Sequence, residues 1–473
     1  MKIAFYTLGC KVNQYETQAL EQLAVRRGHT LVPFEGEADA YVINTCTVTA
    51  VSDKKSRHVI RRARKTAPDG IIAVCGCYPQ THPEDVGRLG VDLIAGTGDR
   101  TGFVELLERT WQERQPITAL DNAFHRRSFE ALPAGGLEGR TRAMLKIEDG
   151  CVNFCSYCII PYARGRVRSL PLEQCAHEAQ TLAEAGYQEI VLTGIEISSW
   201  GQDLGGSLTL IDAVEAICRA VPAHIRVRLG SLEPRTITPE FCRRAAALPN
   251  LCPHFHLSMQ SGCDSVLARM NRKYDSARYY KSVKLLNEAY EAPGITTDLI
   301  VGFPGETEEE FQQTLAFISR CAFSAMHIFP YSRRSGTPAA SMPGQVPKAE
   351  KEARARRARL EQYRAAEDGR VFFRREAERP YVFLEEDIIL EKEIDFLLKK
   401  LEHRHQDYLK IIGSQCMGAA VDEEWLSRGV YNHFSRVFFL TEPGLPHDDA
   451  LPAGEYACLY YRGAYDRLEE HCG

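Results

Sequence analysis

The sequence has no long hydrophobic run and no strong excess of one charge. No apolar stretch in its 473 residues approaches the roughly 18–20 residues that a membrane-spanning helix needs, so we expect no membrane anchor. The first residues, Met1–Thr7, hold one lysine and soon reach polar positions, which is unlike a secretory signal peptide. We therefore expect a cytoplasmic protein.

Internal repeats and low-complexity segments are also absent, and the composition is balanced. Hydrophobic residues make up 44% and charged residues 26% of the chain, as in folded globular proteins. The net charge of −5 argues against a chain-wide attraction to nucleic acid, although a local basic patch can still bind it. Because a domain usually has about 100–200 residues, the length predicts about two to four domains.

Cysteine, by contrast, is abundant, with 16 in the chain. In a long sequence without an export signal, metal or redox chemistry explains them better than disulfides. The clearest group is Cys151, Cys155 and Cys158, a C-x3-C-x2-C motif. At this cysteine content, three cysteines at one fixed spacing would occur by chance only about 0.02 times.

Three thiolates on one short loop can bind a single iron–sulfur cluster and leave one iron open for another molecule. The alternatives are a chance group of buried cysteines and a zinc site. A structural zinc site needs four ligands, and no fourth cysteine or histidine lies close to this motif. The motif therefore favours an iron–sulfur cluster.

The N-terminal segment alternates short apolar runs with helical patterns, which predicts an α/β fold with an open parallel sheet of the Rossmann or flavodoxin type. The expected strands are Ile3–Thr7, Ala40–Ile43, Ile71–Val74 and Val91–Ile94. Cys10, Cys46 and the pair Cys75 and Cys77 each follow one of these strands. Because the carboxyl ends of parallel strands meet at one edge of a sheet, we expect these thiols to gather there.

A second alternation after residue 142 predicts a partial (β/α)6 barrel of the TIM type, with its chemistry in the loops that follow the strands. The expected strands are Ala143–Ile147, Glu189–Leu192, Ile225–Leu229, Phe255–Met259, Thr296–Val301 and Met326–Phe329. The predicted domains are residues 1–120, a linker at 121–142, the barrel at 143–346, a charged helical connector at 347–379 and a small α+β domain at 380–473.

Around the cysteine motif the sequence resembles the radical S-adenosylmethionine superfamily, and within it the methylthiotransferase branch. The resemblance is carried, in the family's order, by Pro161–Arg166, Leu192–Glu196, Arg228–Pro234, His254–Gly262, Asp298–Glu306 and Pro330–Thr337. It implies that S-adenosylmethionine binds the open iron of a [4Fe–4S] cluster on Cys151, Cys155 and Cys158 and is cleaved to a carbon radical. It also implies contacts with S-adenosylmethionine from Thr193, Gly194, Glu196, Ser231, Glu233, Gly302 and Gly305.

The N-terminal motifs resemble the domain that holds a second [4Fe–4S] cluster in that branch. They are Thr7–Thr17, Asn44–Thr49 and Gly76–Gln80, and they imply cluster ligation by Cys10, Cys46 and Cys77. Cys75 and Cys77 would point in opposite directions on an extended strand. The family pattern selects Cys77 and leaves Cys75 as a packing residue.

The residues after Cys10 indicate a substrate. Cys10–Thr17, Asn44–Thr49 and Lys54–Arg57 are similar to the branch that methylthiolates N6-threonylcarbamoyladenosine next to the tRNA anticodon. The resemblance implies a tRNA anticodon stem-loop, an electron donor of the flavodoxin or ferredoxin type, and a sulfur source as partners. A basic helical pattern fits either an RNA-binding surface or a merely solvated one. Its cations are Lys54, Lys55, Arg57, Arg61, Arg62, Arg64 and Lys65.

Two other functions stay open at this point. The same chemistry can act on another tRNA base or on a side chain of a ribosomal protein. A protein of another class, an iron–sulfur redox or ligand-sensing regulator, would bind its ligand without turning over S-adenosylmethionine.

The C-terminal tail departs from the family, which ends in a small β-barrel RNA-binding domain called TRAM. Tyr381–Glu386 fits the first strand of such a barrel, but the helical pattern at Leu390–Leu401 does not continue it. Tyr431–Phe438 and Leu451–Gly463 resemble instead the effector-binding domain of multidrug-sensing regulators.

Overall fold

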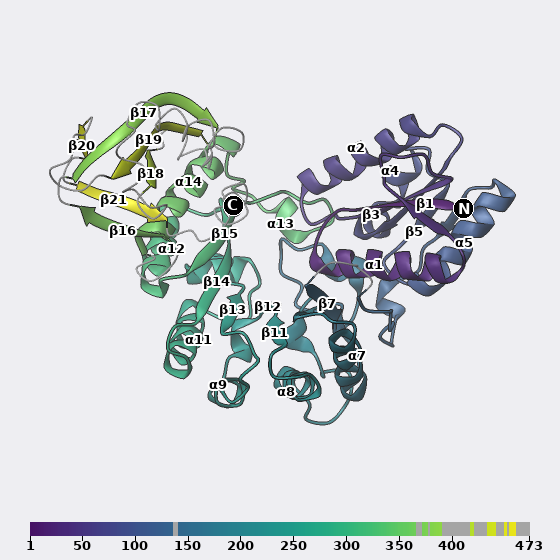
Figure 1. Ribbon diagram of the computed structural model, residues 1–473, viewed down its shortest axis with the longest axis horizontal. Helices are drawn as coiled ribbons and strands as arrows, with labels where there is room; N and C mark the ends of the chain where they lie inside the picture. The colour runs from purple at the N-terminus through teal and green to yellow at the C-terminus, as the bar shows by residue number, and fades with distance from the viewer. Residues whose placement is uncertain are drawn as a thin grey trace. The chain divides into compact units, whose positions relative to one another are not determined.

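The computed structural model describes residues 1–135, 141–365, 371–376, 379–389, 417–420, 433–440, 449–451 and 454–459 (Figure 1). The chain divides into two compact units. The first comprises Met1–Thr297, Phe303–Glu310 and Tyr331–Val346, and the second comprises Asp298–Gly302, Phe311–Pro330 and the chain from Pro347 onward. The predicted boundaries at 120 and 143 lie inside the first unit and stay a prediction. In the described ranges, no helix combines the length and the apolar character that crossing a membrane requires.

The N-terminal part of the first unit is a six-stranded sheet in which every neighbouring pair of strands is parallel. Its order is β2-β1-β3-β4-β5-β6, which is the flavodoxin-like order. The sequence predicted an open parallel sheet of the Rossmann or flavodoxin type, and the structure confirms it. The strands are β1 (Lys2–Thr7), β2 (Thr30–Val32), β3 (Ala40–Thr45), β4 (Ile71–Gly76), β5 (Leu93–Ala95) and β6 (Ile117–Ala119). The strand order reverses between β1 and β3, so this is the topological switch point, where such sheets usually bind ligands.

Helices cover both faces of this sheet. Leu20 of α1 and Phe103 of α5 pack on one face, whereas Val59 of α2 and Val86 of α4 pack on the other (Figure 1). Strands β3 and β4 are buried along their whole length, which explains their continuous apolar sequences. The helices are α1 (Lys11–Arg26), α2 (Ala50–Thr66), α3 (Cys77–Thr81), α4 (Pro83–Gly87) and α5 (Arg100–Glu113).

The barrel region supplies two further sets of parallel strands to the first unit. One is ordered β11-β10-β7, and in the other β12 pairs with β13 and β13 with the first residues of β14. The strands are β7 (Arg142–Lys146), β10 (Glu189–Thr193), β11 (Arg226–Leu229), β12 (Ser231–Leu232), β13 (His254–Leu257) and β14 (Gly294–Val301). The helices are α6 (Ile160–Arg164), α7 (Leu172–Glu184), α8 (Leu210–Ala220), α9 (Pro239–Ala246), α10 (Asp264–Arg269), α11 (Ser276–Ala289) and α13 (Pro338–Ser341).

The second unit contains most of α12 (Glu308–Cys321), strand β15 (Ala325–Pro330) and helix α14 (Lys348–Ala365), which lies in the predicted charged connector. Arg354 and Arg357 of α14 lie over the ring of Phe311, at 5.5 and 4.8 Å. These arginines therefore cover apolar surface of their own unit.

The described parts of the tail are antiparallel strands, β16 with β21 and a sheet ordered β18-β19-β17-β20. They are β16 (Val371–Glu376), β17 (Arg379–Ile389), β18 (Met417–Ala420), β19 (His433–Leu440), β20 (Asp449–Leu451) and β21 (Gly454–Leu459). The helix predicted at Leu390–Leu401 lies outside the described residues. The resemblance of the tail to an effector-binding domain stays a prediction.

Candidate functional site

Cys10, Cys46 and Cys77 lie at the carboxyl ends of three neighbouring strands. Cys10 is the N-cap of α1 after β1, Cys46 directly follows β3, and Cys77 begins α3 after β4. Because β1, β3 and β4 are adjacent in the sheet, the three thiols share one edge, as the sequence predicts. Cys10 and Cys46 flank the topological switch point.

Two glycines allow these loops to approach one another. Gly9 has a φ of +114°, and a Cβ there would lie 2.8 Å from Cβ of Cys46. Gly76 has a φ of +101°, and a Cβ there would lie 2.5 Å from the Thr45 carbonyl oxygen. A larger residue at either position would be strained and would push the cysteine loops apart.

Cys75 differs from Cys77 in its surroundings. Its side chain is fully buried in the core cluster that includes Ile3 and Phe103, and its carbonyl accepts a 2.6 Å hydrogen bond from Oγ1 of Thr45. Cys77 instead begins the helix at the edge of the sheet. The structure thus separates the two cysteines, because β4 ends at Gly76 and Cys77 starts a helix instead of continuing the strand.

The N-terminal thiols fit a cluster better than a single metal ion. Burial raises the pKa of Cys46, and it raises that of Cys77 to about 12. The loop before Cys10 lies against Cys46, since a Cβ on Gly9 would lie 3.2 Å from Sγ of Cys46. Within the described part of the chain, no three His, Cys, Asp or Glu side chains are grouped as ligands of one metal ion. An iron–sulfur cluster is larger than one ion and spaces its thiolates more widely. Coordination would also ionise these thiols despite their burial.

Cys151, Cys155 and Cys158 lie on a single loop between β8 (Glu148–Asp149) and α6. Strand β8 pairs antiparallel with β9 (Arg168–Ser169), and the Cys151 amide donates to the Gly165 carbonyl at 3.0 Å, so both ends of the loop are held together. Burial raises the pKa of Cys151, and it raises that of Cys158 to about 12; Cys155 adds to both increases.

Arg272 contacts this loop, although no motif in the sequence points to it. Its Nη1 donates to Sγ of Cys155 at 3.1 Å, and its guanidinium lies 4.8 Å from the ring centre of Tyr274. A hydrogen bond from a cation stabilises a thiolate over a thiol. The residue is 117 positions from Cys155, so only the fold reveals the contact.

Several of the predicted S-adenosylmethionine contacts lie beside the cysteine loop. Glu196 reaches Nδ2 of Asn153 at 3.5 Å, and its charge affects Cys151. Thr193 ends β10 and is buried, and Gly194 and Glu196 follow it in the next turn. Ser231 begins β12, and Glu233 follows that strand. A hollow next to the loop is lined by Asn153, Cys155, Glu233, Arg235, Asn271, Arg272 and Lys273.

Gly302 and Gly305 lie in close protein contacts. A Cβ on Gly302 would lie 2.2 Å from Cγ of Lys351, within the second unit. The Gly305 amide donates to the Gly344 carbonyl at 2.8 Å. Both residues have positive φ and lie in the turn after β14. Their role in cofactor binding stays a prediction.

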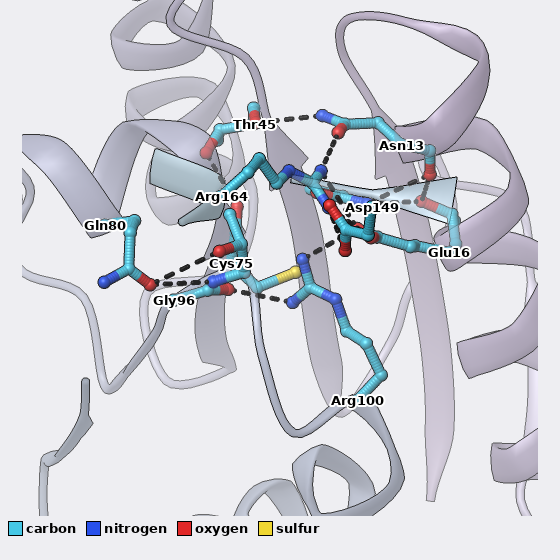
Figure 2. A network of polar contacts seen from close by, with 12 residues as sticks. Asn13, Glu16, Thr45, Cys75, Gln80, Gly96, Arg100, Asp149 and Arg164 are labelled. Atoms are coloured by element: carbon cyan, nitrogen blue, oxygen red, sulfur yellow. Dashed lines mark hydrogen bonds and ion pairs between the residues drawn. The ribbon is translucent and has the colours of Figure 1, made fainter. Parts of the chain in front are cut away.

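A buried ionic network joins the N-terminal sheet to the barrel region within the first unit (Figure 2). Glu16 of α1 is fully buried and accepts from Nζ of Lys146 at 2.9 Å, from Nη2 of Arg100 at 3.0 Å, and from both terminal nitrogens of Arg164. Asp149 binds Lys146 at 2.8 Å and Arg168 at 3.3 Å.

The electrostatics of this network are dominated by its cations. Burial alone would raise the pKa of Glu16, but Arg164, Lys146 and Arg100 hold it well below its usual range. Burial also opposes ionisation of Asp149, yet Lys146 and the nearby arginines lower its pKa to about 2. Both carboxylates are therefore ionised at neutral pH. The network holds two more cations than carboxylates. An anionic group near Arg164, such as a thiolate-bound cluster, would offset part of that charge.

Asn13 connects this network to two of the cysteine loops. Its Oδ1 accepts from Nη2 of Arg164 at 2.8 Å, and its Nδ2 donates to the carbonyls of Leu8 and Thr45 at 2.8 and 3.0 Å (Figure 2). Leu8 lies two residues before Cys10, and Thr45 directly precedes Cys46. One amide side chain thus spans the switch point of the sheet.

Comparison with known proteins defines the class. Residues 145–318 match the family model described as "Radical SAM superfamily", and residues 2–96 match "Uncharacterized protein family UPF0004". The fold is similar to that of TsrM from Kitasatospora setae, a radical S-adenosylmethionine methyltransferase, with a TM-score of 0.52 and 16% identity over 72% of this chain and 77% of that one. The barrel is therefore a radical S-adenosylmethionine fold.

More similar relatives define the family. The "Threonylcarbamoyladenosine tRNA methylthiotransferase MtaB" of Bacillus subtilis is 46% identical over 73% of this chain and 76% of the relative. The protein of the same name from Aquifex aeolicus is 38% identical over 75% and 86%. A "tRNA-2-methylthio-N(6)-dimethylallyladenosine synthase" of Symbiobacterium thermophilum is 36% identical over 75% and 78%. The chain belongs to the radical S-adenosylmethionine methylthiotransferase family, whose cofactors are S-adenosylmethionine and [4Fe–4S] clusters.

Proposed function

We propose that this protein adds a methylthio group to carbon 2 of N6-threonylcarbamoyladenosine next to the anticodon of tRNA. The observation that carries the proposal is the presence of two separate thiol triplets, one at the switch point of the N-terminal sheet and one on the barrel loop, within one compact unit. The names of the Bacillus and Aquifex relatives supply the substrate.

The residues of this chain have distinct roles in the proposal. Cys151, Cys155 and Cys158 would hold one cluster, and Cys10, Cys46 and Cys77 the other. When bound, these clusters and S-adenosylmethionine supply a carbon radical that removes a hydrogen atom from an unactivated aromatic carbon, and a methylated sulfur to replace it. Arg272 stabilises the thiolate of Cys155 through its 3.1 Å contact. An electron donor of the flavodoxin or ferredoxin type and a sulfur source complete the set of partners.

An aromatic group at the rim of the barrel loop supports an RNA substrate. Phe154 and Tyr162 are 39% and 42% exposed, and their ring centres lie 6.0 Å apart. Phe124 stacks near Phe154 at 6.1 Å with an angle of 8° between the rings. Proteins that bind single-stranded RNA often stack unpaired bases on such rings.

Helix α2 carries the basic residues that the sequence offers for RNA binding, but several of them already contact other groups of the protein. Arg64 bonds Asp92 and the carbonyl of Gly70, and Arg57 donates to the Tyr78 hydroxyl at 2.9 Å. Arg62 lies over the rings of Tyr6 and Phe34. The exposed cations are Lys54, Lys55, Arg61, Arg62 and Lys65, and of these Arg62 also pairs with Glu35 at 3.7 Å. Helix α2 begins four residues after Cys46, so these cations extend from the edge that carries the N-terminal thiols.

The double variant Lys54→Glu/Lys55→Glu should weaken tRNA binding and its salt dependence. Each lost phosphate contact lowers the slope of log affinity against log salt by about 0.7–0.9, so the slope should fall by up to about two. Filter binding or fluorescence anisotropy over a salt series measures both quantities. Lys281→Glu/Lys284→Glu, which makes the same charge change on the exposed surface of α11, is the matched control. Equal losses in the two double variants would contradict a specific role for α2.

Deletion of the gene should remove the 2-methylthio derivative of N6-threonylcarbamoyladenosine from cellular tRNA completely. Mass spectrometry of tRNA nucleosides, with and without the gene, measures this directly. The wild-type gene should restore the product, and a gene lacking either cysteine triplet should not. If thiolation of that nucleoside is unchanged in the deletion strain, the proposal is wrong. If a methylthio group is lost from another adenosine instead, that base is the substrate.

A further inference from the structure

Arg164 is the one cation of the buried network that reaches the N-terminal thiols. It ends α6, six residues after Cys158, and is fully buried. Its Nη2 donates to Oδ1 of Asn13 at 2.8 Å, and the same oxygen lies 3.9 Å from Sγ of Cys10. A residue at the end of α6, the helix that follows the barrel cysteines, thus places its charge beside the loops of the other triplet.

The Arg164 guanidinium also has a hydrogen-bond donor to spare. Its two terminal nitrogens bond Glu16 and Asn13, but its Nε is buried without a partner among the described residues. The Nε of Arg100 is buried without a partner in the same way, but that arginine acts on Cys75 in the apolar core, whereas Arg164 bonds Asn13 beside Cys10. A buried unpaired donor is destabilising unless a water or a bound group accepts from it. A sulfur of a cluster on Cys10, Cys46 and Cys77 is an acceptor of the right chemistry.

We propose that Arg164 is a positioning residue that raises the reduction potential of the N-terminal cluster and fixes its loops through Asn13. The inference rests on the proposed ligand set of Cys10, Cys46 and Cys77. Reduction adds negative charge to a cluster, and a nearby cation or an N–H donor to its sulfurs stabilises that charge. Glu16 holds the guanidinium in place, and Asn13 transmits its position to the segments before Cys10 and Cys46.

Arg100 is a natural matched control. It is also buried, and it also binds Glu16, at 3.0 Å. Its charge acts on Cys75, the cysteine of the apolar core, and its Nη1 donates to the Gly96 carbonyl at 3.0 Å (Figure 2). Replacing either arginine removes the same charge from the same carboxylate. Only Arg164 contacts Asn13.

The test uses the full-length chain with Cys151, Cys155 and Cys158 changed to alanine, so that only the N-terminal cluster is loaded. A redox titration followed by electron paramagnetic resonance gives its midpoint potential. Arg164→Gln should shift the potential to a more negative value, and Arg100→Gln should shift it much less. Arg164→Lys, which keeps the charge, should lie closer to the parent protein than Arg164→Gln does.

Asn13→Asp serves as a second variant if Arg164→Gln does not fold. It is nearly isosteric and adds a negative charge where Oδ1 now accepts from Arg164, so it should also lower the potential. Equal shifts in the two arginine variants, or an unchanged potential in Arg164→Gln or Asn13→Asp, would overturn the role of Arg164. The proposed cluster ligands would not be affected by that result. A chain without the barrel cysteines that holds no iron would overturn the ligand assignment as well.

Discussion

Replacement of Cys10, Cys46 and Cys77 by alanine should remove about half of the protein's iron and abolish methylthio transfer, while cleavage of S-adenosylmethionine continues. Replacement of Cys151, Cys155 and Cys158 should remove the other half and abolish both reactions. The reason is that a cluster depends on its thiolate ligands and each triplet lies on its own loops. Iron analysis of anaerobically purified protein, with chromatography of the nucleoside products, measures these outcomes.

The buried cysteines outside the triplets supply the control for this experiment. Cys75→Ala removes a thiol only two residues from Cys77, yet its side chain lies in the apolar core. It should keep the full iron content, at a modest cost in stability for the lost side-chain volume. Full iron after loss of Cys10, Cys46 and Cys77, or loss of iron in Cys75→Ala, would reject the proposed ligand set.

Glu16→Gln should lower the free energy of unfolding by about 3–5 kcal/mol, the usual cost of leaving buried charges without their partner. Three cations bind this carboxylate directly, namely Arg100, Lys146 and Arg164, and they would be left facing a neutral amide. Chemical denaturation followed by circular dichroism measures the change. Glu105→Gln removes an exposed partner of Arg27 and should cost at most about 1 kcal/mol. Similar costs for the two variants would mean that the network contributes little.

Lowering the pH should destabilise the folded protein through the same carboxylate, that of Glu16. The pKa of Glu16 is far lower in the folded protein than the 4.5 of a free glutamate, because the cations outweigh the effect of burial. Its stabilising contribution is therefore complete above about pH 4.5 and is lost as the pH falls toward the folded pKa. The difference in unfolding free energy between the parent protein and Glu16→Gln should be constant from pH 5 to 7 and shrink below that range. A difference that grows in acid would contradict this account.

Most of the fold follows from the sequence because buried parallel strands are continuous apolar runs. Strands β3 and β4 were predicted from such runs, and both are buried on both faces. Strands β2 and β6 escaped prediction because each has only three residues at an edge of the sheet.

The sequence predicted the thiols but not what surrounds them. Cysteines are recognisable by type and spacing, and the strand ends were enough to place Cys10, Cys46 and Cys77 at one edge. The contact of Glu16 with Arg164 joins residues 148 positions apart, and that of Arg272 with Cys155 spans 117. Charged residues are usually exposed, so their sequence gives no sign that these groups are buried together. Only the fold supplies those pairings.

The buried cross-connection also limits how such a protein can be divided or recombined. A cut between residues 120 and 143 would leave Glu16 in one fragment and its partners Lys146 and Arg164 in the other. Each fragment would expose unmatched charges at a surface that is otherwise closed, so neither should fold well by itself. In a hybrid gene that joins halves from two relatives, the half that supplies Glu16 and the half that supplies Lys146 and Arg164 must therefore still form these ion pairs.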